Sequence, residues 1–170
     1  MKSIKSIFLL PVFIFMMASS VLSQVTLPEV FVASVRYKYL VSVDNRNLAQ
    51  PIRLLENKAA SYDIKNSEFY EDDFDEYYIT FYLPSGYVLA TYDKEGKLLR
   101  TAERFKNVIL PKAVSQSLYN AYPDWSIPKD VYLVTYENEA GATKVWKVLL
   151  KQGDKRMKVK LNEKGEFIAK

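Results

Sequence analysis

The feature that most constrains the fold of this chain is an internal sequence similarity at nearly constant spacing. Four positions in the first half match positions 63 residues later: Leu55, Asn57, Tyr62 and Ile64 correspond to Leu118, Asn120, Trp125 and Ile127. The turn-like segment YDKEGK at 92–97 then matches LNEKGE at 161–166, which lies 69 residues later. Self-similarity at fixed spacing indicates a repeated structural unit. We therefore predict two tandem copies, over about 31–105 and 97–170, that share one strand.

Hydrophobic periodicity predicts the elements of each copy. The alternation of apolar residues over 31–43 is typical of a half-buried strand, and apolar spacing of three and four predicts helices within 47–63 and 110–122. Three strands are expected over 76–105 and four over 130–169, with a longer hairpin around 138–143 in the second copy. All the glycines fall in candidate hairpin turns: Gly86, Gly96, Gly141, Gly153 and Gly165. The predicted fold class is α+β, an antiparallel sheet made of two helix-plus-hairpin units with the helices on one face.

The N-terminal residues 1–23 have the form of a secretory signal peptide. Two lysines precede an apolar run over 7–17, and small residues follow that suit cleavage between Ser23 and Gln24. The run is short for a transmembrane helix, and an uncleaved anchor is the alternative. Because the chain has no cysteine, it has no lipid-attachment motif. We expect an exported protein, periplasmic or secreted, without a membrane anchor after cleavage and with a single domain over 24–170.

The residue types that are missing exclude several kinds of chemistry. Without histidine or cysteine, the chain cannot form a Ser-His-Asp or Cys-His catalytic site or a zinc finger. The glycines are all used by turns, so none is left for a phosphate-binding loop. We expect no cofactor, no metal and no catalytic residue, although a carboxylate-based enzyme stays open as an alternative. The nine basic residues of 142–170 are interpreted as a solvated face that protects a sheet edge, not as a nucleic-acid site.

The stretch EFYEDDFDEYY at 68–78 places six acids among five aromatic rings. It lacks the glycine and the ligand spacing of an EF-hand loop, so a specific calcium site is not favoured. The interpretation we favour is a solvated, shortened and charged version of the hairpin expected around 138–143, or of its loop, held to the sheet edge by the rings of Phe69, Tyr70 and Phe74. A docking surface for a basic partner is the alternative, and its candidate residues are Glu71, Asp72, Asp73 and Asp75.

A set of short motifs resembles the PepSY-like, beta-lactamase-inhibitor-like (BLIP-like) family of exported Bacteroidetes proteins. The motifs are the YD-x-x-G-K turn, the LP that opens the second helix, the YP-x-W that closes it, the K-D-x-Y strand and the C-terminal N-E-K-G-E turn. In order, they cover about 30–170. The resemblance implies an exported α+β domain with a protein-binding or inhibitory role and no established catalytic residue. A nicotinate-nucleotide adenylyltransferase activity is not credible, because that enzyme needs a histidine motif.

Together these observations predict an exported, non-enzymatic binding module. Its partner is expected to be a protein or peptide of unknown identity, bound by surface complementarity or by strand addition. We expect a monomer that binds no nucleic acid. A carboxylate-based enzyme and a structural envelope protein are the alternatives.

Overall fold

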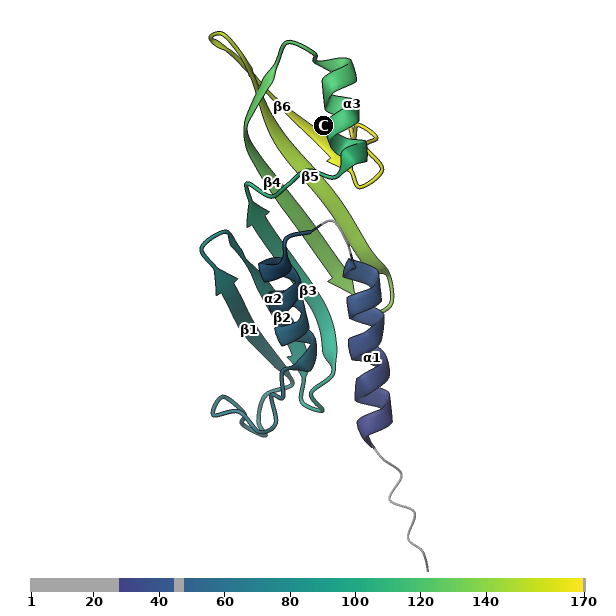
Figure 1. The fold of residues 1–170 in the computed structure, drawn as a ribbon. Helices are drawn as coiled ribbons and strands as arrows, with labels where there is room; N and C mark the ends of the chain where they lie inside the picture. Colours follow the sequence, from purple (N-terminus) through teal and green to yellow (C-terminus); the bar gives the residue numbers. More distant parts are fainter. Residues whose placement is uncertain (1–27, 45–47, 170) are drawn as a thin grey trace, which may run out of the picture.

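The computed structural model describes residues 28–44 and 48–169, so the predicted signal peptide lies outside the described residues. The described residues form three helices and one six-stranded antiparallel sheet, which confirms the α+β class (Figure 1). In chain order the elements are α1 (Pro28–Val43), α2 (Gln50–Ser61), β1 (Glu76–Leu83), β2 (Gly86–Asp93), β3 (Leu98–Lys106), α3 (Lys112–Ala121), β4 (Ser126–Glu137), β5 (Gly141–Gln152) and β6 (Lys155–Asn162). No helix among them is long and apolar enough to span a membrane.

The strand predicted over 31–43 is wrong, because this segment is helix α1. Its burial follows a helical period: Tyr39 and Val43, four residues apart, are buried, whereas Tyr37 and Val41 of the predicted strand face are 72% and 56% exposed. The segment contains apolar residues at both spacings, so alternation alone could not decide between strand and helix. Packing on the sheet decides it, since the ring of Tyr39 contacts that of Tyr136 at 5.1 Å.

Helices α2 and α3 confirm the two helix predictions. Pro51 occupies the first turn of α2, where a missing backbone N–H costs nothing. Ile52, Leu55 and Ala59 form its buried stripe, and Val114 and Leu118 form that of α3. In Figure 1 all three helices lie on the same side of the sheet, as predicted.

The sheet is a meander in which each strand pairs with the next along the chain. Only three of the four strands predicted over 130–169 form. The fourth is reduced to a single bridge between Leu161 and Phe167. The tyrosine and tryptophan at the centre of the second half stack closely, with the rings of Tyr132 and Trp146 4.4 Å apart.

The strand register reproduces part of the internal sequence similarity. Tyr77 pairs with Tyr92 in β1–β2, and the residues 69 positions later, Trp146 and Leu161, pair in β5–β6. The two matching turns also contain the same type of hydrogen bond. In each turn the glycine N–H, of Gly96 or of Gly165, donates to the carbonyl oxygen three residues before it. Duplication of the whole unit stays a prediction, and the leading strand expected in the first copy is α1 instead.

Candidate binding surfaces

The alternation of side chains divides the sheet into a helix-covered face and an open face. Hydrogen bonds from Tyr39 to Glu103 and from Tyr92 to Ala59 join the helices to the covered face. Side chains one residue out of phase point to the other side, where no described helix packs. This open face carries Tyr78 and Tyr82 of β1, Tyr87 of β2, Arg100 and Arg104 of β3, Val131 and Leu133 of β4, Lys147, Leu149 and Lys151 of β5, and Arg156, Lys158 and Lys160 of β6.

A tyrosine cluster, made of Tyr78, Tyr82 and Tyr87, occupies the β1–β2 end of the open face. Their exposed fractions are 60%, 79% and 39%, and Tyr82 lies directly opposite Tyr87 in the sheet. Arg100 lies beside the cluster, 2.7 Å from the carboxylate of Glu76 and 5.9 Å from the ring centre of Tyr78. Exposed tyrosine and arginine side chains are the types that protein interfaces favour.

The β5–β6 end of the open face carries two rows of like charges. Lys147 lies directly opposite Lys160, and Lys151 lies opposite Arg156. Directly opposed like charges destabilise a sheet, so these basic rows work against folding stability. Leu149 lies between them and faces Lys158, which gives the surface an apolar floor between its cations.

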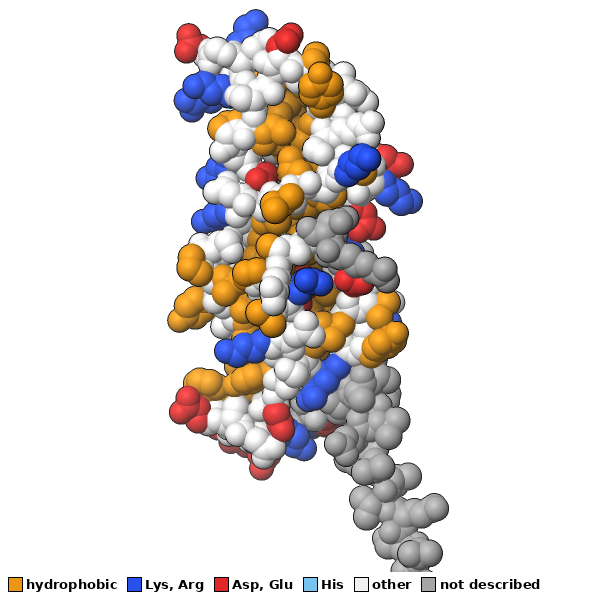
Figure 2. All heavy atoms as spheres, viewed as in Figure 1, with side chains coloured by type: hydrophobic (Ala, Val, Ile, Leu, Met, Phe, Trp, Pro, Cys, Tyr) orange, Lys and Arg blue, Asp and Glu red, His pale blue; other side chains and the backbone are white. Residues whose placement is uncertain are grey.

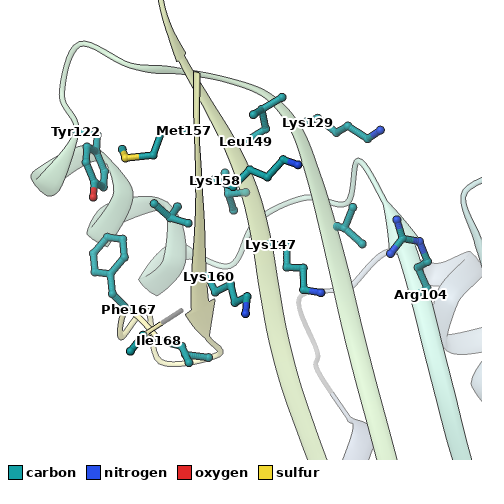
Figure 3. Close-up of a pocket in the computed structure, with 14 residues that line it drawn as sticks. Arg104, Tyr122, Lys129, Lys147, Leu149, Met157, Lys158, Lys160, Phe167 and Ile168 are labelled. Carbon is teal, nitrogen blue, oxygen red and sulfur yellow. The ribbon is translucent and has the colours of Figure 1, made fainter. Parts of the chain in front are cut away.

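A hollow of about 880 Å³ lies around β6 (Figure 3). Tyr122, Met157 and Phe167 line it on the α3 side of the strand, and Lys147 and Lys158 line it on the open-face side. Its lining belongs to both faces and extends on the open face as far as Val131 of β4 and Arg104 of β3, so the hollow does not form one enclosed cleft. No carboxylate lines it, whereas the carboxylate-enzyme alternative requires a cleft that holds two or more acids.

The acidic stretch is a loop of turns between α2 and β1, and it does not form a shortened hairpin. Its four candidate docking residues, Glu71, Asp72, Asp73 and Asp75, are all exposed. Two of its rings contact Tyr77 at the start of β1: Tyr70 stacks at 5.5 Å and Phe74 meets the ring edge-on at 6.3 Å. Phe69, predicted as a third anchor, is 57% exposed. Among the described residues no group of three or more acids is arranged to hold a metal ion.

A pair of buried carboxyl groups lies between α2 and the sheet, and our sequence reasoning missed it. Glu56 and Glu103 are each only 3% exposed. Tyr39 and Thr101 each donate a hydrogen bond of 2.8 Å to Oε1 of Glu103. The sequence did carry a signal, because Glu56 stands four residues after Ile52 on the apolar stripe of α2.

Burial raises the pKa of both carboxyl groups, since it disfavours the charged form. The pKa of Glu56 rises to about 8, through burial first and then through the negative charge of Glu103. The pKa of Glu103 rises to about 7, again mainly through burial, and the hydrogen bonds from Thr101 and Tyr39 limit the rise. The pair therefore holds a proton near neutral pH, as two adjacent buried carboxyl groups do.

Comparison with protein-family models and with curated proteins finds no match. The solved structures that are similar include a BLIP-like protein from Bacteroides fragilis NCTC 9343. The similarity covers 80% of this chain and 82% of that one, at 16% sequence identity and a TM-score of 0.34. At this TM-score the backbones superpose only loosely. The α+β class therefore rests on the helices and strands described above, and membership of the PepSY-like or BLIP-like family stays a prediction.

Proposed function

We propose that this chain is an exported, non-enzymatic protein-binding module, and that the open face of its sheet contacts an acidic surface of the partner protein. The leader at 1–23 supports export. The open face carries the proposal, because the described helices all pack on the other side and leave tyrosines and cations exposed.

The basic rows are the single observation that favours binding most. A surface that served only solubility would gain stability by placing opposite charges across from each other. Here Lys147 faces Lys160 and Lys151 faces Arg156. An acidic partner would remove this repulsion on binding, and the apolar floor at Leu149 would add buried area. Charge complementarity of this kind directs partner choice and raises association rates.

Capture experiments on residues 24–170 test the proposal. The bait is incubated with the exported fraction of the producing organism, beside the double variant Lys147→Glu/Lys158→Glu. The matched control is Lys65→Glu/Lys112→Glu, which reverses two exposed lysines outside the sheet, in the loop after α2 and at the start of α3.

The proposal expects a partner that the wild type and the control retain, that the open-face variant loses and that salt elutes. Equal retention by all three baits, or no retained protein, would contradict it.

A further inference from the structure

The two outer edges of the sheet are protected to very different degrees. Strand β6 has four cations in eight residues: Lys155, Arg156, Lys158 and Lys160. The C-terminal segment also pairs with it, through the Leu161–Phe167 bridge and a 2.9 Å bond from the N–H of Ile168 to the carbonyl oxygen of Lys160. Edge charges and edge coverage are two devices by which proteins stop a foreign strand from pairing.

Strand β1, at the other edge, has much less of this protection. Its one charged residue, Glu76, stands at the first position, and the remaining residues 77–83 (YYITFYL) include no charge and no proline. All eight β1–β2 pairs run in continuous register without a bulge. No described segment pairs with the outer side of β1. Aromatic and β-branched residues of this kind are also the strongest strand formers.

The surroundings of this edge are apolar along its length and acidic at one end. Figure 2 shows hydrophobic side chains along the margin where Figure 1 places β1, with acidic side chains below them. The acidic loop is held at the start of β1 by the contacts of Tyr70 and Phe74 with Tyr77. An incoming strand would therefore meet negative charge at the N-terminal end of β1 and exposed Tyr78 and Tyr82 along the open-face side.

We propose that the outer edge of β1 accepts an extended segment of a partner protein as a seventh strand, with basic residues of that segment beside the acidic loop. Backbone hydrogen bonds to the unpaired edge supply the affinity, and alternate side chains supply the specificity. The partner segment carries apolar or β-branched residues in its centre and lysine or arginine at one end. This site is separate from the basic open face. It takes a basic partner segment, whereas the open face is proposed to contact an acidic surface.

A second copy of this chain fits the edge less well than a basic partner. The edge strand of a second copy would bring its own acidic loop, and no basic residue occurs between Lys65 and Lys94. A β1–β1 pairing would therefore add no basic side chain from either edge segment to the acidic loops.

Synthetic peptides of about eight residues, the common strand length, provide the probe. One peptide has two lysines followed by alternating valine and threonine, and a second has the same residues with the lysines at the other end. One of the two should bind, according to whether the added strand runs parallel or antiparallel to β1. The controls replace the lysines by glutamates, or methylate alternate backbone nitrogens to remove the pairing donors.

Amide hydrogen exchange followed by NMR gives the decisive readout. Strand addition pairs only the backbone groups that point outward, so every second amide of β1 should exchange more slowly when the peptide binds. The amides of β6 should not change. Protection of β1 that increases with protein concentration without any peptide would overturn the assignment to a partner in favour of a second copy.

A matched pair of variants tests the position of the site. Thr80→Lys adds an edge-protecting charge to β1, and Thr135→Lys makes the same exchange on the same face of the inner strand β4; both threonines are exposed. We expect Thr80→Lys to weaken peptide binding about tenfold or more, a change of about 1.4 kcal/mol, and Thr135→Lys to change it less than about twofold.

Equal effects of the two variants would overturn the proposal, as would unprotected β1 amides at millimolar peptide. The open-face variant Lys147→Glu/Lys158→Glu should bind the peptide normally, which separates this site from the proposed function.

Discussion

Replacement of Glu56 by glutamine should stabilise the protein at alkaline pH. The glutamine keeps the size and polarity of the side chain but removes a carboxyl group that is 3% exposed. In the wild type this group must ionise in a buried position as the pH rises, and the charge of Glu103 opposes that ionisation. The variant has no such group, and its amide can donate a hydrogen bond to Glu103.

The pH range follows from the raised pKa. Between about pH 4.5, the ordinary value for a glutamate, and about pH 8, the folded wild type holds a proton at Glu56 that the unfolded chain has released. Stability falls with rising pH wherever the folded state binds more protons. Below about pH 4.5 the buried carboxyl group therefore does not lower the free energy of unfolding. Its destabilising effect increases up to about pH 8 and then stays constant.

The size of the effect follows from the same shift. A shift from 4.5 to about 8 corresponds to a ceiling of roughly 5 kcal/mol, at about 1.4 kcal/mol per pKa unit. Because Glu56 and Glu103 share one titration, part of this cost remains with Glu103 in the variant. We expect Glu56→Gln to be more stable than the wild type by about 2–3 kcal/mol at pH 9 and nearly equal to it at pH 5.

Urea unfolding at intervals from pH 5 to pH 9 measures this difference. Glu95→Gln serves as the control, since it makes the same exchange at an exposed position outside the buried pair. Wild-type stability that stays constant or rises from pH 6 to pH 9 would refute the reasoning. So would a Glu56→Gln variant that is less stable than the wild type at pH 9.

Three further substitutions test the packing. Gly86→Ala should lower the melting temperature sharply and reduce the free energy of unfolding by about 1–3 kcal/mol or more. The reason is that the new Cβ would lie 2.1 Å from the carbonyl oxygen of Arg104. An unchanged melting curve would contradict this close approach. Val148→Ala should lower the free energy of unfolding in urea by about 2 kcal/mol, since Val148 of β5 is 1% exposed in the hydrophobic core, and a loss under half of this would indicate a loose core. Tyr39→Phe should lower the free energy of unfolding by about 1–3 kcal/mol. The loss should be larger at pH 9 than at pH 5, because the ionised Glu103 then lacks the hydrogen bond from the Tyr39 hydroxyl. A loss independent of pH would argue against stabilisation of the Glu103 carboxylate by Tyr39.

The sequence predicts elements best where one periodicity dominates. Helices α2 and α3 each have a proline near the start and a single apolar stripe, so both were predicted within a few residues. Helix α1 was predicted as a strand because its apolar residues fit both periods, and only its packing against β3 and β4 separates them. Local patterns do not contain that tertiary contact.

The candidate surfaces likewise include one feature that the local sequence predicts and two that depend on the fold. The exposure of Glu71, Asp72, Asp73 and Asp75 follows from a dense run of like charges that no core could bury. The basic rows depend on which lysines lie opposite each other, and that depends on the register of β5 and β6. The unprotected edge depends on strand order, which places β1 on the outside of the sheet. Neither the register nor the strand order could be determined from composition.

Site-specific photocrosslinking tests most directly whether the open face is the binding surface. A photoreactive aromatic residue replaces Lys151 on the open face, opposite Arg156 and away from the β1 edge, in one strain and Tyr119 on α3 in another; both side chains are exposed. After illumination of the intact producing cells, we predict a discrete crosslinked partner at position 151 and none at position 119. A partner crosslinked only at position 119, or equally at both positions, would contradict the proposed function.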